Sequence, residues 1–121
     1  MARGRILIVE DSALVTDALR ILFDDAGYDV AVAGSVSEAV EVAESSPTDV
    51  MLLDLTLPDG DGIDVVKTLR RRSALPRVTI AMTGHTDAES RAKCLEAGCA
   101  EVLLKPVPVG ELLRQIEHHL A

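Results

Sequence analysis

The sequence predicts an α/β fold in which a doubly wound parallel sheet carries helices on both faces. Short apolar runs alternate five times with segments of helical apolar spacing, and the connections between them are short. One of these runs, residues 50–53, has no polar break and leads directly into Asp54, as is typical of a strand buried on both faces. A length of 121 residues is sufficient for one domain with a single core. We therefore expect residues 1–121 to fold as a single domain.

The first half of the chain predicts two strands and two helices in alternation. Residues 6–9 form an aliphatic run, and residues 12–26 place apolar side chains at helical spacing. Residues 29–33 alternate in the way that a strand does. The next helix is expected to open at Ser35 or Ser37, because serine is a common N-cap residue.

The third strand ends at Asp54 and is followed by a turn and by two further strand–helix pairs. Asp59 and Asp61 follow Pro58 and each precede a glycine, so we interpret them as turn residues and not as ligands. The later elements are expected as a helix from about residue 62 to residue 72, a strand over residues 78–82, a helix over residues 87–97, a strand over residues 100–104 and a helix over residues 109–120.

Composition and charge exclude several classes of function. The formal net charge of −8 argues against direct contact with nucleic acid or with an anionic membrane. Only 2% of the residues are aromatic, so a surface that stacks on nucleic-acid bases is not expected. No apolar run approaches the ~20 residues of a membrane helix, and the N-terminal apolar run ends at once in Glu10, unlike a signal peptide. We therefore expect a cytoplasmic chain.

The two cysteines, Cys94 and Cys99, do not form a C-x-x-C pair, and no second cluster completes a zinc site. Cys94 falls in an expected helix and Cys99 lies just before an expected strand. We interpret both as small buried side chains in a reducing compartment.

Charged or reactive side chains follow four of the five expected strands: Glu10 and Asp11, Asp54, Thr83, and Lys105. The carboxyl ends of parallel strands lie at one edge of the sheet, where ligands bind. Three carboxylates in a partly dry cleft repel one another, and Mg²⁺ with oxygen ligands relieves that repulsion. A hydroxyl and an ammonium group are suited to a phosphoryl group, which leaves Asp54 free to act as a nucleophile.

Each of these residues also has an ordinary structural explanation. Glu10, Asp11 and Ser12 fit the N-cap region of the first helix, where negative charge is favourable. Thr83 fits a helix cap, and Lys105 alone fits a solvated surface charge. The coincidence of these groups at one edge favours the functional interpretation.

Four segments of the sequence stand out together: ILIVEDS, DVMLLDLTLPDGDG, IAMTGH and AGCAEVLLKPV. In this order and spacing they resemble the receiver domain of bacterial two-component response regulators, over essentially the whole chain. The resemblance implies a flavodoxin-like (βα)5 fold with strand order 2-1-3-4-5. It also implies a phosphoacceptor signalling domain of a phosphorelay, which is not an enzyme beyond catalysing its own phosphorylation and slow autodephosphorylation.

The resemblance implies a role for each residue at this edge, and it implies a cis peptide bond between Lys105 and Pro106. The implied roles are Asp54 as phosphate acceptor and metal ligand, Asp11 as a direct Mg²⁺ ligand, Glu10 as an indirect one, the Thr56 backbone carbonyl as a further metal ligand, Thr83 as the hydroxyl that moves to the phosphoryl group, and Lys105 as the ammonium group that binds it.

The resemblance also implies partners. The phosphodonor would be a histidine kinase, a phosphotransfer protein or a small phosphodonor, and Leu14, Val15 and Pro106 are candidate contacts for a docking kinase. A downstream effector, or a second copy of the chain, would bind a face that switches on phosphorylation. That face consists of residues 87–97, 101–104 and 109–120.

One residue departs from the family pattern. Val102 occupies the position where the family usually has a tyrosine or phenylalanine whose rotation reports activation, so the output switch is expected to be weaker or differently built. The alternative hypothesis is a pseudo-receiver, an interaction module that works without phosphorylation. Thr56 and His85 occupy positions that tune the lifetime of the phosphoryl group in the family, and we interpret His85 as an exposed loop residue in preference to one that orients water.

Overall fold

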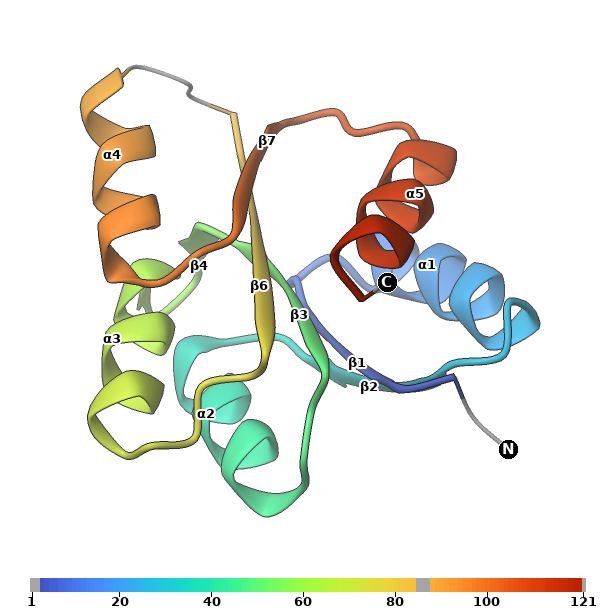
Figure 1. Cartoon of the computed structure of the whole chain (residues 1–121), viewed down its shortest axis with the longest axis horizontal. Helices are drawn as coiled ribbons and strands as arrows, with labels where there is room; N and C mark the ends of the chain where they lie inside the picture. The colour runs from blue at the N-terminus through green and yellow to red at the C-terminus, as the bar shows by residue number, and fades with distance from the viewer. Residues whose placement is uncertain (1–2, 85–87, 121) are drawn as a thin grey trace.

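The computed structural model describes residues 3–84 and 88–120, and it places one five-stranded parallel sheet between two layers of helices (Figure 1). In chain order the elements are β1 (Arg5–Val9), α1 (Ala13–Asp25), β2 (Asp29–Ala33), α2 (Val36–Ser45), β3 (Val50–Asp54), β4 (Thr56–Leu57), β5 (Gly60–Asp61), α3 (Ile63–Arg71), β6 (Val78–Thr83), α4 (Ala88–Ala97), β7 (Glu101–Leu104) and α5 (Val109–Leu120).

The strand order of the large sheet is β2-β1-β3-β6-β7, which is the predicted flavodoxin-like order 2-1-3-4-5. All of its neighbouring strands are parallel, with Ile6 opposite Val50 in the β1–β3 pair and Val50 opposite Val78 in the β3–β6 pair. The order reverses between β1 and β3, because β2 lies outside β1 while the later strands follow on the other side. Ligands of open α/β sheets bind at such a switch point, beyond the carboxyl ends of the strands.

Helices α1 and α5 cover one face of the sheet, and α2, α3 and α4 cover the other (Figure 1). The α1/α5 side is filled by large side chains such as Phe23 and Ile116, both without exposed surface. The opposite side includes smaller ones, among them Cys94 and Cys99, which are 1% and 5% exposed. Both cysteines are buried free thiols, in agreement with the prediction of buried side chains.

Local caps explain where the first two helices begin. Ser12 Oγ accepts a hydrogen bond from the Val15 amide at 3.4 Å, and α1 begins at the next residue. At α2 the cap is Ser35, which settles the choice between Ser35 and Ser37: its Oγ accepts from the Glu38 amide at 3.2 Å. Serine hydroxyls are effective caps because they satisfy amides that have no partner inside the helix.

The turn after β3 contains two short strands, β4 and β5, that the sequence did not predict. They form a separate antiparallel hairpin whose turn contains Pro58 and Asp59. The interpretation of Asp59 as a turn residue is therefore confirmed, whereas Asp61, also interpreted as a turn residue, lies in β5. Two predictions fall outside the described residues: His85 as an exposed loop residue, and residue 87 as the start of the fourth helix. Within the described part of the chain, no helix is both long and apolar enough to cross a membrane.

Candidate functional site

The carboxyl ends of β1 and β3 bring three predicted carboxylates together at the switch point of the sheet. Glu10, Asp11 and Asp54 each offer an oxygen atom, and these atoms all lie within 4.8 Å of one another. Glu10 and Asp54 are 5% and 4% exposed, whereas Asp11 is exposed to solvent. The sequence prediction that strand ends would gather these groups is correct for all three.

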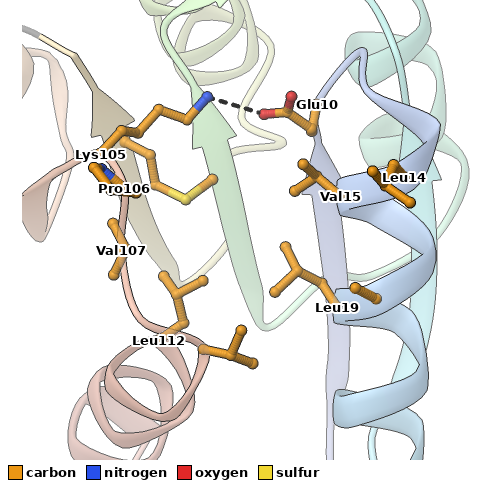
Figure 2. A pocket seen from close by; sticks show the side chains of 11 residues that line it. Glu10, Leu14, Val15, Leu19, Lys105, Pro106, Val107 and Leu112 are labelled. Carbon is orange, nitrogen blue, oxygen red and sulfur yellow. Dashed lines mark hydrogen bonds and ion pairs between the residues drawn. The ribbon is translucent and has the colours of Figure 1, made fainter.

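Lys105 reaches the same point from the end of β7 and contacts both buried carboxylates. Its Nζ donates to Asp54 Oδ2 at 2.9 Å and to Glu10 Oε2 at 3.2 Å. Figure 2 shows the lysine side chain extended toward Glu10 from the opposite wall of a cavity. The peptide bond between Lys105 and Pro106 is cis, as predicted. The ammonium group of Lys105 therefore bridges the two carboxylates.

Backbone amides satisfy the remaining oxygens of the two buried carboxylates. The Thr56 amide donates to Asp54 Oδ1 at 2.9 Å, and the Ser12 amide donates to Glu10 Oε1 at 3.3 Å. Each carboxylate thus has one oxygen on a backbone amide and the other on the shared lysine. This arrangement fixes the orientation of both groups.

The site shifts the pKa of its two buried carboxyl groups in opposite directions. Burial raises the pKa of Glu10, and the adjacent Asp54 raises it further. Burial also opposes the ionisation of Asp54, but hydrogen bonds with Glu10 and Lys105 and with the Thr56 amide outweigh burial and lower the pKa of Asp54. Burial opposes the charge of Lys105 too, but the two carboxylates raise its pKa overall. Asp54 therefore stays ionised, and Lys105 stays charged beside it.

The donor set fits a hard divalent cation. Three carboxylates face one ammonium group, so negative charge remains in excess at the point where the carboxylate oxygens converge. All of the donors are oxygens, which Mg²⁺ prefers, and the exposed Asp11 leaves the site open to water, which Mg²⁺ usually retains. Thr56, whose carbonyl is the remaining predicted ligand, lies two residues after Asp54 on β4.

The loop after Asp54 passes unusually close to the start of α3. The Gly62 amide donates to Leu55 O at 2.9 Å, and a Cβ at residue 62 would lie 2.9 Å from Leu55 Cα and closer still to the Asp54 carbonyl oxygen. Only glycine fits there without moving the backbone. In the sequence Gly62 is only the glycine that follows Asp61, near the expected start of a helix, and this requirement for space is visible only in the fold.

Thr83 ends β6 beside the same edge and is 7% exposed. Its carbonyl accepts the Lys105 amide at 2.8 Å, which ties the end of β6 to the start of the loop that carries the lysine. Val102, at the position of the family's switch aromatic, is 4% exposed, and its carbonyl accepts from Arg91 Nη1 at 3.3 Å. His85 lies outside the described residues.

A mainly apolar cavity of about 620 Å³ adjoins the charged site between α1 and the segment that leads into α5 (Figure 2). Leu14 and Val15 line it from α1, and Pro106 lines it from the opposite side. These are the three residues predicted to contact a docking kinase, and the structure brings them together. Leu14 is 83% exposed, so the rim of the cavity presents apolar surface to solvent.

The sequence model of the response regulator receiver domain matches residues 6–117 of the chain. The chain belongs to this family, whose members are the receiver domains of two-component systems. These are signalling domains and not classical enzymes; they interact with kinases or phosphodonors and bind a divalent metal in an acidic pocket.

Individual relatives support this assignment. The chain is 35% identical over 118 residues to the DNA-binding response regulator MtrA of Mycobacterium tuberculosis (strain ATCC 25618 / H37Rv), which covers 98% of the chain and 51% of MtrA. It thus spans about half the length of this relative. Among solved structures it is similar to a CheY-like response regulator receiver domain protein from Methanospirillum hungatei JF-1, with a TM-score of 0.88, 29% identity and coverage of 97% of this chain and 93% of that one. It is also similar to the beryllofluoride-activated NtrC4 receiver domain dimer, with a TM-score of 0.86, 30% identity and coverage of 96% and 95%.

Proposed function

We propose that Asp54 accepts a phosphoryl group in an Mg²⁺-dependent reaction, and that this transfer is the signalling function of the chain. The observation that carries the proposal is the pairing of Asp54 with Lys105 at 2.9 Å inside a cluster of three carboxylates at the switch point. A pair of this kind keeps a buried carboxylate ionised, and only the ionised form is nucleophilic.

The chemistry assigned to the chain's own residues is a displacement at phosphorus. A carboxylate oxygen of Asp54 forms the new bond to phosphorus as the bond to the donor's nitrogen or oxygen breaks, which gives an aspartyl phosphate. Lys105 holds an ammonium group where the oxygens of the phosphoryl group arrive, and Thr83 offers its hydroxyl from the end of β6. Glu10 and Asp11, with Asp54 and the Thr56 carbonyl, would hold Mg²⁺, which supplies charge neutralisation for the phosphoryl oxygens.

The chain catalyses only its own phosphorylation and the slow loss of the phosphoryl group. We propose that residues 1–121 form one receiver domain and that it works in the cytoplasm, where histidine kinases and phosphotransfer proteins present their phosphoryl groups. The donor docks over the apolar cavity, with Leu14, Val15 and Pro106 in contact. This surface leads directly to Lys105 and Glu10, which line the same cavity (Figure 2).

The output surface is the face formed by α4, β7 and α5. It exposes the apolar side chains of Leu95, Leu104 and Val109, which are 43%, 53% and 42% exposed. A downstream effector or a second copy of the chain would cover them, and the NtrC4 receiver was solved as a dimer in its activated form. Val102 beneath this face is a buried aliphatic residue, so the change at the face is transmitted without the rotation of an aromatic ring.

The test is intact-mass measurement after incubation with acetyl phosphate, with and without Mg²⁺. Wild type is expected to gain one phosphoryl group only with Mg²⁺, and Asp54→Asn is expected to gain none. Asp29→Asn, which changes an exposed aspartate at the opposite end of the sheet, should behave as wild type. If the folded wild-type protein gains no adduct at saturating Mg²⁺, the proposal is overturned in favour of an interaction module that works without phosphorylation.

A further inference from the structure

Asp59 lies in the turn of the β4–β5 hairpin, but its carboxylate binds a different element. Its Oδ1 accepts from the Val36 amide at 2.7 Å, and its Oδ2 accepts from the Ser37 amide at 3.2 Å. These two amides open α2 and lie 23 and 22 residues earlier in the chain. The bonds with Val36 and Ser37 lower the pKa of Asp59, so it is ionised at the positive end of the helix dipole.

The hairpin that carries Asp59 is too short to hold its own position. Each of its strands has two residues, and even longer isolated two-stranded hairpins are marginal in water. Contacts with the rest of the molecule fix it at three places. The Leu55 amide donates to Met82 O of β6 at 3.0 Å at the base, Leu57 is buried at 8% exposure in the middle, and Asp59 binds α2 at the tip.

The same hairpin contains Thr56, whose backbone carbonyl is one of the proposed Mg²⁺ ligands. Thr56 is the first residue of β4, and its amide holds Asp54 Oδ1 at 2.9 Å. A continuous connection therefore runs from Asp54 through Thr56 and the hairpin to Asp59 and α2. If the tip is released, the contacts at Leu55 and Leu57 remain, so the hairpin stays in place but loses the contact that sets its tilt against α2. We expect the Thr56 peptide to follow that change in tilt, because it belongs to the hairpin.

We propose that Asp59 is a positioning residue for the cation site: by fixing the hairpin against α2, it orients the Thr56 carbonyl toward the metal and so sets the affinity for Mg²⁺. The inference rests on the proposed function. Groups that orient a metal ligand without touching the metal commonly change metal affinity by about 10–100-fold. The coupling is reciprocal, so Mg²⁺ at the site also stiffens the contact with α2.

The competing explanation is that Asp59 only stabilises the start of α2. Ser35 provides the matched control, because its hydroxyl caps the same helix end at the Glu38 amide. Its other hydrogen-bond partner among the described residues is the Ser37 hydroxyl at 3.4 Å, and it makes no hydrogen bond there with the hairpin itself. Removing either group should lower the melting temperature by a few degrees. Only the removal of Asp59 should change the metal site.

The experiment is an Mg²⁺ titration followed by NMR of the backbone amides, for wild type, Asp59→Ala, Asp59→Asn and Ser35→Ala. In wild type, the amides of Thr56, Val36 and Ser37 should all shift with Mg²⁺. Asp59→Ala should bind Mg²⁺ about tenfold more weakly and lose the response at Val36 and Ser37. Asp59→Asn, which keeps one acceptor oxygen, should be intermediate, and Ser35→Ala should match wild type in affinity.

Phosphoryl uptake provides a second measurement. With acetyl phosphate, Asp59→Ala should be slow at low Mg²⁺ and recover the wild-type rate at saturating Mg²⁺, because the acceptor and Lys105 are untouched. Equal Mg²⁺ affinity in wild type and Asp59→Ala would overturn the inference and leave the proposed function intact, as would equal weakening by Ser35→Ala. Wild type that binds no Mg²⁺ would overturn the proposed function, and the inference with it.

Discussion

Two pairs of neighbouring buried acids can be compared in the described part of the fold: Glu10 with Asp54, where one member stays ionised, and Cys94 with Cys99, which are both neutral. At the edge of the sheet, Asp54 is buried but stays ionised, because hydrogen bonds with Glu10, with Lys105 and with the Thr56 amide outweigh burial and lower its pKa. In the core, Cys94 and Cys99 are buried beside each other, and burial together with the neighbouring thiol raises the pKa of Cys99 to about 12. Burial by itself suppresses the charge of an acid, and hydrogen bonds together with an opposite charge from another part of the chain restore it.

The two groups also come together in different ways. Cys94 and Cys99 meet at the end of one helix, where the Cys99 amide binds Cys94 O at 3.0 Å across Gly98, which has a φ of +128°. This is a helix C-cap that packs two small side chains into the core. The acidic edge joins residues from three separate strand ends. The two cysteines are close because they are near in sequence, and their contact contributes to core packing. The groups of the site come from segments that are far apart in sequence, and the strand order of the sheet brings them together.

Lys105→Met should have the largest effect, because it removes the positive charge beside Asp54 and leaves a buried acid without a cationic partner, as in the thiol pair. Without the ammonium group, burial should raise the pKa of Asp54, and phosphoryl uptake from acetyl phosphate should fall by about 10²–10³-fold. The initial rate by intact mass is the measurement. Lys93→Met, which removes an exposed lysine paired with Glu89 at 3.5 Å, is the control and should react as wild type. An unchanged rate in Lys105→Met would show that the lysine does not set the charge of the acceptor.

Glu10→Gln tests whether burial of the Glu10 carboxylate, which raises its pKa, lowers the stability of the protein at neutral pH. A raised carboxyl pKa contributes stability below the ordinary value of 4.5, and that stability is lost as the pH rises through the raised value. In Mg²⁺-free buffer, the variant should therefore unfold at higher urea than wild type at neutral pH, with the difference shrinking toward acid, while its Mg²⁺ affinity falls. Glu96→Gln, at an exposed position, should change neither quantity. A less stable Glu10→Gln protein at neutral pH would show that the pair with Lys105 outweighs burial.

The thiols give the smallest expected effect, which is the absence of a reaction. Because burial raises the pKa of both Cys94 and Cys99, the native protein should react with a disulfide reagent only as fast as it opens. Both thiols should react at once in denaturant. The measurement is the amount of thiolate that the reagent releases, one per reacting cysteine, in native buffer and in denaturant. Fast labelling of the native protein would mean that the pair is exposed in solution and that the contrast with the edge is overstated.

Much of this architecture follows from the sequence alone. The alternation of strands and helices predicts that Glu10, Asp54 and Lys105 lie at one edge, because the carboxyl ends of parallel strands all lie at the same edge of a sheet. The order of the strands was implied by the family resemblance, since five short apolar runs do not specify their neighbours. The bridge from Lys105 to both carboxylates was not predicted, because it depends on the conformation of the lysine side chain and on the distance between the strand ends.

The hairpin after Asp54 shows why the rest could not be predicted. Strands of two residues are too short for an alternating pattern, and the partners of Asp59 lie 22 and 23 residues away. An aspartate before a glycine predicts a turn wherever it occurs. Its contact with Val36 depends on how α2 packs beside the hairpin, and that information is in the tertiary structure.

The tight passage at Gly62 determines how the chain tolerates substitution. A side chain there would collide with the backbone of Asp54 and Leu55, so every replacement must push the acceptor strand aside. In a library that varies each codon and selects for signalling, position 62 should be depleted about as strongly as position 54, although glycine contributes no reacting atom. A map of mutational tolerance would thus mark two kinds of indispensable position in this loop, one for its chemistry and one for the space it leaves.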